Sequence, residues 1–256
     1  MKAAPCVLVL AALAACRPDA PATEQATPGQ ATPPGATATI AHPADTLHLP
    51  TSVVQLLPSS AEEFNKLPAS PLPELYNDPK AEPQPTDQEQ VRRQGLDLFL
   101  KTGLRDELKL SSTPDAEFTI QNPDAVRYMY WGNLPAAHQW VVRAWYWESD
   151  GTVLVDQRNG HMLDVPGTPA MSADGRFLVL TSPGLGGGDQ PNTVSLVEIT
   201  RDGPRLRWQR EPTAWQAEEA RWAHPGIAIL KVRHVNAQGE LPDDAPASYV
   251  QLPMPR

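Results

Sequence analysis

Five acidic side chains in the second half of the chain could take part in acid–base chemistry: Glu148, Asp150, Glu211, Glu218 and Glu219. A glycosidase needs one carboxyl group that donates a proton and a second that acts as nucleophile or base. Glu148, Asp150 and Glu211 are of interest because two of them follow a tryptophan-rich segment. The sequence does not place any two of these groups at the required separation. A polysaccharide hydrolase is therefore an alternative hypothesis, and the enzyme question stays open.

Other patterns of catalytic or ligand-binding residues are missing from the sequence. It contains no His-Glu-x-x-His, no Gly-x-Ser-x-Gly, and no glycine loop that continues into Lys and Ser or Thr. We therefore assign no catalytic residue, no metal ligand and no cofactor. The 21 basic residues against 30 acidic ones give a formal charge of −9, which argues against a nucleic acid partner.

An aromatic cluster marks the segment that we predict as a binding surface. In a β-strand, Trp145 and Trp147 face one side and Tyr146 faces the other. Indoles can stack on a glycan or form an apolar patch for an envelope protein, and Arg143 can supply hydrogen bonds. The alternative, which bulky rings on both faces favour, is that this strand is covered by a sheet on each side.

The pattern after residue 115 is that of an antiparallel, mainly β domain. Apolar residues alternate with polar ones, and four hairpin signals interrupt them: Asp150-Gly151, Asn159-Gly160, Asp174-Gly175 and Asp202-Gly203. Strands are predicted at 116–121, 126–131, 138–147, 152–157, 161–165, 176–182, 193–200, 204–210, 226–234 and 247–252. Short strands joined by tight turns predict an all-β architecture.

Two segments about fifty residues apart have a common shape. The first is Pro169-Ala-Met-Ser-Ala-Asp-Gly-Arg-Phe-Leu-Val-Leu, and the second is Ala220-Arg-Trp-Ala-His-Pro-Gly-Ile-Ala-Ile-Leu. Both resemble the strand-turn-strand opening of a β-propeller blade, as in tandem WD40-like and periplasmic repeats. A closed propeller needs at least four blades and only three units fit, so we expect an open stack of about three blade-like antiparallel sheets. A β-sandwich is the alternative.

The first sixteen residues have the features of a secretory signal that ends in a cysteine. Lys2 is followed by an apolar stretch from Cys6 to Ala15, too short to span a membrane and typical of a secretory signal. Leu13-Ala14-Ala15-Cys16 resembles the lipobox of bacterial lipoproteins. The resemblance implies cleavage between Ala15 and Cys16 and acylation of Cys16, so that lipid, palmitate included, anchors the chain in a membrane. The same resemblance implies that Arg17, rather than aspartate, after the cysteine favours the periplasmic face of the outer membrane over the inner membrane.

The remaining N-terminal region is rich in proline. About half of the 29 prolines precede residue 90, whereas all 7 tryptophans follow residue 130. We predict a signal peptide at 1–15, a disordered Pro/Ala/Thr-rich tether at 16–84, and an all-β domain at 85–256. One or two helices are expected before the sheets: a short one that Ser60 caps and that runs to Lys66, and a longer one at 87–102 that Gly103 ends.

These observations predict a membrane-anchored envelope lipoprotein with a non-catalytic β domain that binds or scaffolds a partner. The membrane is the first partner, through the N-terminal lipid, and an envelope protein or a glycan is the second. The hydrolase hypothesis would instead require two of Glu148, Asp150 and Glu211 to converge in a cleft.

Overall fold

The computed structural model describes residues 46–49, 52–74, 82–85, 88–104, 107–187 and 189–254. All of them belong to one compact unit, Ala41–Arg256. The predicted signal peptide, Cys16 and the tether up to residue 45 lie outside the described residues.

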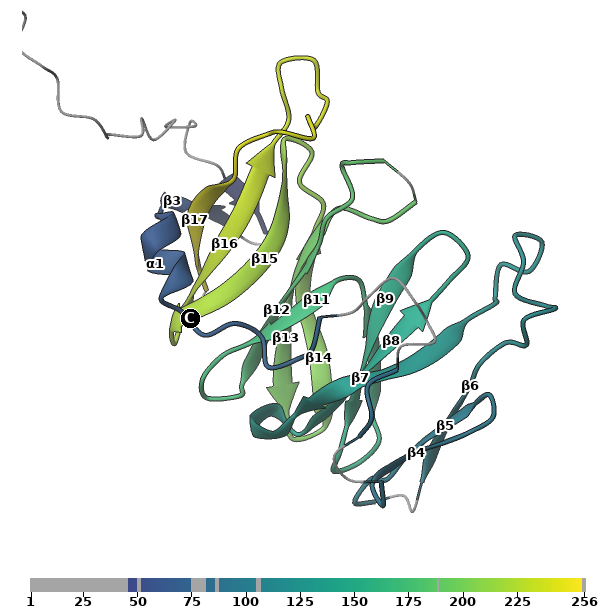
Figure 1. Ribbon diagram of the computed structural model, residues 1–256. Helices are drawn as coiled ribbons and strands as arrows, with labels where there is room; N and C mark the ends of the chain where they lie inside the picture. Colours follow the sequence, from purple (N-terminus) through teal and green to yellow (C-terminus); the bar gives the residue numbers. More distant parts are fainter. Residues whose placement is uncertain are drawn as a thin grey trace, which may run out of the picture. The chain divides into compact units, whose positions relative to one another are not determined.

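Two four-stranded antiparallel meanders form the middle of this unit, in teal and green in Figure 1. Each consists of four strands that are consecutive in the sequence, as in a propeller blade. The first contains β7 (Arg127–Leu134), β8 (Gln139–Trp145), β9 (Asp150–Asp156) and β10 (Met162–Val165); the second contains β11 (Thr168–Met171), β12 (Phe177–Ser182), β13 (Thr193–Thr200) and β14 (Gly203–Arg210). The turns at Asn159-Gly160, Asp174-Gly175 and Asp202-Gly203 connect paired strands as predicted, whereas Asp150-Gly151 begins β9.

A third four-stranded sheet combines both ends of the folded unit. Its strands are β15 (Trp215–His224), β16 (Ile227–His234), β17 (Ser248–Pro253) and β3 (Leu57–Pro58). The short strand β3 pairs antiparallel with β17 and places Pro58 opposite Val250. The short strand β3, which precedes the two middle sheets in the sequence, therefore supplies the outer strand of the third sheet.

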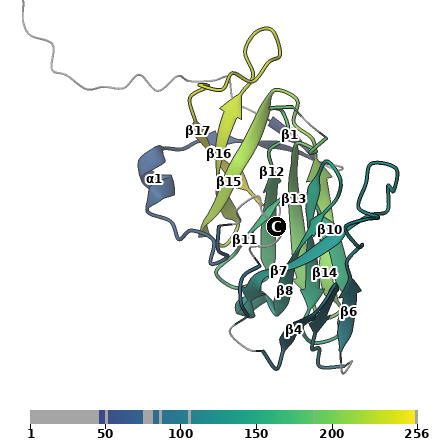
Figure 2. The same ribbon diagram turned by 45° about the vertical axis from the view of Figure 1, so that its right-hand side comes forward.

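The helix α1 (Ala61–Asn65) follows β3 and contacts β16 and β17, as Figure 2 shows. Ser60 caps it as predicted, because its side-chain oxygen accepts a hydrogen bond from the Glu63 N–H at 3.1 Å. Phe64 is the buried residue of this helix, and its ring lies 5.2 Å from the ring of Tyr249 on β17. This contact fixes α1 to the third sheet.

Two small sheets complete the described structure. A hairpin is formed by β1 (Thr46–His48) and β2 (Val53–Gln55), and a three-stranded sheet is formed by β4 (Val91–Gln94), β5 (Asp97–Leu100) and β6 (Leu108–Ser111). On β4 to β6, the ion pairs Arg92–Glu107 (2.7 Å) and Lys109–Asp97 (3.3 Å) occupy partly exposed positions.

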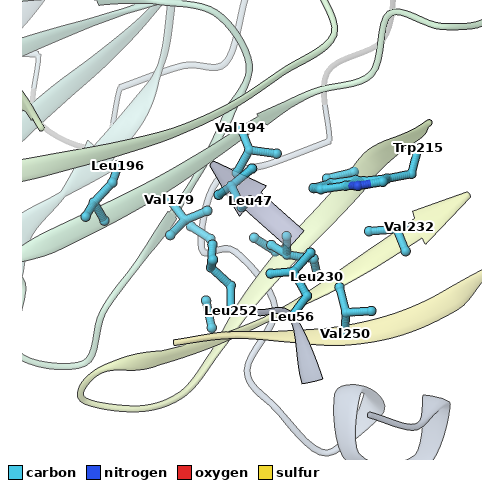
Figure 3. Close-up of a cluster of buried hydrophobic side chains, with 14 of the residues drawn as sticks. Leu47, Leu56, Val179, Val194, Leu196, Trp215, Leu230, Val232, Val250 and Leu252 are labelled. Atoms are coloured by element: carbon cyan, nitrogen blue, oxygen red, sulfur yellow. The ribbon is translucent and has the colours of Figure 1, made fainter. Parts of the chain in front are cut away.

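Apolar cores separate the sheets, which therefore form an open stack. One core lies between β4–β6 and β7–β10, the next between β7–β10 and β11–β14, and the third between β11–β14 and β15–β17 with β3. The residues alternate between cores along each middle strand: Val141 belongs to the second core and Val142 to the first. Figure 3 shows Leu47 and Leu56 from the N-terminal segment inside the third core, beside Leu230 and Leu252.

The predicted fold class is thereby confirmed: the protein is mainly β, with several antiparallel sheets and one short helix before most of them. The described sheets do not close into a barrel. A plain two-layer sandwich is not what forms, because both middle sheets are buried on their two faces by the cores just described.

The helix predicted at 87–102 is wrong. Its residues form the β4–β5 hairpin, in which Gln94 pairs with Asp97 and the loop consists of Gly95 and Leu96. Gly95 has a φ of +58°, which a hairpin turn requires and a helix does not tolerate. Leu98 and Leu100 are both buried at a spacing of two, so the apolar pattern follows strand periodicity.

The predicted boundary between tether and domain at 84/85 is also displaced. Residues 46–74 contain β1, β2, β3 and α1, and they contribute to the third core. Leu47 is 3 % exposed and Leu56 is 1 % exposed. Proline-rich composition does not prevent this packing, since short strands with few apolar residues can still complete a larger sheet.

Candidate functional site

The four residues of the predicted binding surface separate into three places. Arg143 and Trp145 lie on β8 two positions apart and therefore on one face of it. Tyr146 and Trp147 follow the end of this strand. The expectation that Trp145 and Trp147 share a face is not met, because β8 ends at Trp145.

Arg143 and Trp145 line an open pocket of about 490 Å³, which we call the junction pocket. Three sheets and the segment 69–74 contribute to it. Its lining residues are Ala69, Ser70, Leu72, Pro73, Glu74, Trp131, Arg143, Trp145, Thr168, Glu219 and Arg221. A pocket of this size, with aromatic walls and a few polar groups, has the properties of small-ligand sites in proteins.

The guanidinium of Arg143 lies against two indoles. Its central carbon is 5.1 Å from the ring centroid of Trp131 and 5.7 Å from that of Trp145, both within the range of cation–π attraction. The Trp131 indole is itself fixed, because its N–H donates to the carbonyl of Pro73 at 2.9 Å. The Arg143 side chain is only 13 % exposed, so these contacts hold most of it out of water.

Asp150 neutralises Arg143 across the β8–β9 hairpin. Nη2 of Arg143 donates to Oδ1 of Asp150. Asp150 is in turn held by Gln190, whose side chain accepts from the Asp150 N–H at 2.9 Å and donates to its backbone carbonyl at 3.1 Å. Gln190 also donates to Oγ of Ser182 at 2.8 Å. The glycine-rich loop before Asn192 is thus connected to the pocket wall.

A second arginine, Arg221, lies on the opposite wall. Its Nε donates to Glu219 at 2.7 Å, and Nη1 donates to the carbonyl of Leu67 at 3.2 Å, just beyond α1. Its guanidinium carbon lies 4.4 Å from the Phe64 ring centroid. These contacts fix Arg221, and Glu219 remains the more accessible partner of the pair, with 39 % of its side chain exposed against 17 %.

Tyr146 and Trp147 have other surroundings. The Tyr146 hydroxyl donates to Oδ2 of Asp164 at 2.5 Å, and burial, followed by this hydrogen bond, raises the pKa of Tyr146 far above its ordinary value. Trp147 is 47 % exposed and its ring lies 6.0 Å from that of Phe118. Neither residue lines the junction pocket.

The three carboxylates of the hydrolase hypothesis have different partners. Asp150 is engaged by Arg143 and Gln190. A hydrogen bond with Asp189 raises the pKa of Glu148, which is exposed to solvent. Glu211 is exposed after the end of β14, in another sheet. In the described part of the chain these groups do not form a paired acid and base within the junction pocket.

Over the described ranges, no group of three or more His, Cys, Asp or Glu residues is placed to hold a metal ion. None of the helices in the same ranges has the length and apolar character needed to cross a membrane.

A second hollow, of about 580 Å³, lies between the Asp174-Gly175 and Pro225-Gly226 turns. Phe177 and Trp222 stack there with ring centroids 6.5 Å apart, and the Trp222 N–H donates to the carbonyl of Ala170 at 2.8 Å. The walls are mostly apolar. This hollow presents fewer polar groups than the junction pocket and is not part of the predicted surface.

The sequence identified Arg143 and Trp145 as binding residues, and it named Asp150 and Glu219 only as candidate acids without placing them beside these two. Trp131 belongs to the same aromatic cluster, and its role could have been proposed from that. Ser70, Glu219 and Arg221 are far away in the sequence, and only the stacking of sheets brings them to the pocket. No known protein family, no curated protein and no solved structure matches this chain.

Proposed function

We propose that the protein is a lipid-anchored envelope protein whose β domain binds a ligand in the junction pocket and has a binding rather than a catalytic role. The single observation that carries the binding part is the position of Arg143 between Trp131 and Trp145 at the wall of an open pocket. Tryptophan and arginine are enriched among the residues that contribute most to binding energy at protein interfaces.

The anchoring part rests on the sequence. Leu13-Ala14-Ala15-Cys16 has the residues of a lipobox, and the proline-rich segment after it provides a spacer. Several acyl chains on Cys16 would anchor the protein stably, since each buried methylene contributes roughly 0.8 kcal/mol. We place the protein at the periplasmic face of the outer membrane, because Arg17 follows the cysteine.

One set of full-length variants tests both parts. The wild-type chain should enter the detergent phase in a phase-separation assay, whereas Cys16→Ala should remain in the aqueous phase. The soluble Cys16→Ala chain is then mixed with purified envelope fragments and sedimented. Adding Trp145→Ala should reduce sedimentation at least several-fold, whereas adding Trp147→Ala, outside the pocket, should not.

Two outcomes would contradict the proposal. Detergent-phase partitioning that Cys16→Ala leaves unchanged would refute the anchor. Sedimentation that does not depend on Trp145 would refute the pocket as the binding site, whatever the ligand is.

A further inference from the structure

The charged groups at the junction pocket are already paired with one another. Arg143 is paired with Asp150, and Arg221 is paired with Glu219 at 2.7 Å. Glu74, which is exposed to solvent, is the remaining charged residue of the lining. An anion would meet only arginines that are already paired with carboxylates, and a cation would meet only the exposed Glu74 outside the two ion pairs, so the lining favours a neutral ligand.

The hydrogen-bonding groups of the pocket include both donors and acceptors. Nε and Nη1 of Arg143 and Nε1 of Trp145 are buried N–H donors with no hydrogen-bond partner among the described residues. The carboxylate of Glu219 and the hydroxyls of Ser70 and Thr168 can accept. An unpaired buried donor is costly to the folded protein, so a ligand oxygen that hydrogen-bonds to one of these nitrogens is favoured. The suitable ligand carries many groups that both donate and accept, which describes hydroxyl groups.

The aromatic walls add a requirement for apolar surface. Trp131 is 4 % exposed, whereas Trp145 is more accessible and has a free N–H at the same time. A pyranose ring combines a face of C–H groups, which packs on an indole, with hydroxyls at its edge. Neutral hydroxylated ligands without an apolar face would not pack on the indole of Trp145.

We infer that the junction pocket binds a neutral saccharide, with Trp145 as the stacking ring and Arg143 and Glu219 as hydrogen-bonding partners. This inference rests on the proposed binding function and names its ligand class. The pocket volume of about 490 Å³ fits a small ligand or the end of a longer chain. The guanidinium carbon of Arg143 lies 5.7 Å from the Trp145 ring centroid, so a sugar that packs on this indole changes the surroundings of both side chains, and Trp145 reports binding.

Fluorine NMR of the full-length protein, labelled with fluorotryptophan, tests the inference. The chain has 7 tryptophans, and their resonances are assigned with single Trp→Phe variants. The neutral probes are methyl glucoside, N-acetylglucosamine and cellobiose; the charged probes are glucuronate, inorganic phosphate and choline. We expect at least one neutral sugar to shift the Trp145 and Trp131 resonances but not that of Trp222, and the charged probes to bind about tenfold more weakly or not at all.

Other outcomes separate this inference from the function on which it rests. Tighter binding of glucuronate, phosphate or choline at Trp145 would overturn the neutral class while the pocket remained a binding site. The neutral class would also be overturned if no neutral sugar shifted the Trp145 resonance while envelope sedimentation still depended on Trp145. If no neutral sugar shifts the Trp145 resonance and sedimentation is also independent of Trp145, both the saccharide inference and the proposed binding function are wrong. If the active sugar also displaces the chain from envelope fragments, the ligand is a surface glycan; if it does not, the ligand is a free saccharide.

Discussion

The guanidinium of Arg143 on β8 lies over the indole of Trp131 on β7, with its central carbon 5.1 Å from the ring centroid. A bulge in β7 accompanies this contact: Tyr130 pairs with Val142 and Gly132 pairs with Val141, so Trp131 is the extra residue. The segment 69–74 crosses at the same point, where Trp131 donates to Pro73. The pocket is therefore built where an irregular strand meets a connecting segment, on regular sheets that hold both.

The loop residue Gln190 is predicted to tune ligand binding. Gln190→Ala removes its hydrogen bonds to Asp150 and Ser182, so Asp150 no longer holds Arg143 in one position. We expect envelope sedimentation to weaken about three- to tenfold and the free energy of unfolding to fall by about 1 kcal/mol. Gly186→Ala, in the same loop with open space around it, is the control. Equal effects of both variants would contradict the coupling.

The N-terminal strand region is predicted to be essential to the folded domain. Leu56, 1 % exposed in the third core, lies beside Leu57, which is 44 % exposed. Leu56→Ala should lower the free energy of unfolding by about 2–5 kcal/mol, measured by urea denaturation, and Leu57→Ala should change it by less than about 0.5 kcal/mol. If a chain shortened to begin at residue 85 unfolds at the same urea concentration as one beginning at residue 46, this prediction is wrong.

The two glycines in the turns of the blade-like segments, Gly175 and Gly226, are predicted to differ in how much an alanine substitution destabilises the fold. Gly175 has a φ of +68°, and a Cβ there would lie 2.1 Å from the carbonyl oxygen of Ala136. Gly226 has a φ of +90° with nothing within 4 Å. Gly175→Ala should therefore destabilise by roughly 2–4 kcal/mol and Gly226→Ala by only about 1–2 kcal/mol. Thermal unfolding of the two variants measures this difference, and equal midpoints would contradict the close approach of Ala136.

The buried carboxylate of Asp156 is predicted to make the free energy of unfolding depend on pH in the acidic range. Burial raises its pKa, but hydrogen bonds and charge from Arg158, with a hydrogen bond from Gln139, outweigh burial and hold the pKa below its ordinary value. Since the folded pKa is depressed, the stabilisation is complete above the ordinary pKa of about 3.9 and is lost as pH falls through the folded pKa.

Asp156→Asn should accordingly lower the free energy of unfolding by about 1–3 kcal/mol at neutral pH. The difference from the wild type should shrink below about pH 4. Urea titrations at several pH values measure it. A difference that stays constant down to strong acid would show that ionisation of Asp156 contributes nothing.

Local patterns predicted much of the fold. Strands β7 to β10, β12 to β14, β16 and β17 coincide closely with the expected ranges, because alternating apolar residues and glycine turns are local signals. The segment 116–121 is not a strand; its residues form turns. The helix at 87–102 failed for an identifiable reason, since Gly95 in its middle was a turn signal that the apolar stripe concealed.

Contacts between residues far apart in the sequence could not be predicted from local sequence patterns. Pairing of Pro58 with Val250, and the approach of Arg221 to the carbonyl of Leu67, join residues separated by most of the folded unit. Such contacts depend on how sheets stack, and no pattern within one segment encodes them. For the same reason the aromatic cluster identified Arg143 and Trp145 but suggested Trp147 instead of Trp131 as their partner.

The central claim is that Trp145 and its neighbours form the ligand site, and one measurement tests it most directly. Calorimetry can give the affinity of the full-length protein for soluble saccharides released from the envelope. Trp145→Ala should weaken this affinity about tenfold or more, whereas Trp147→Ala, at a similarly aromatic but separate position, should change it by less than about twofold. Equal affinities for wild type and Trp145→Ala would contradict the account.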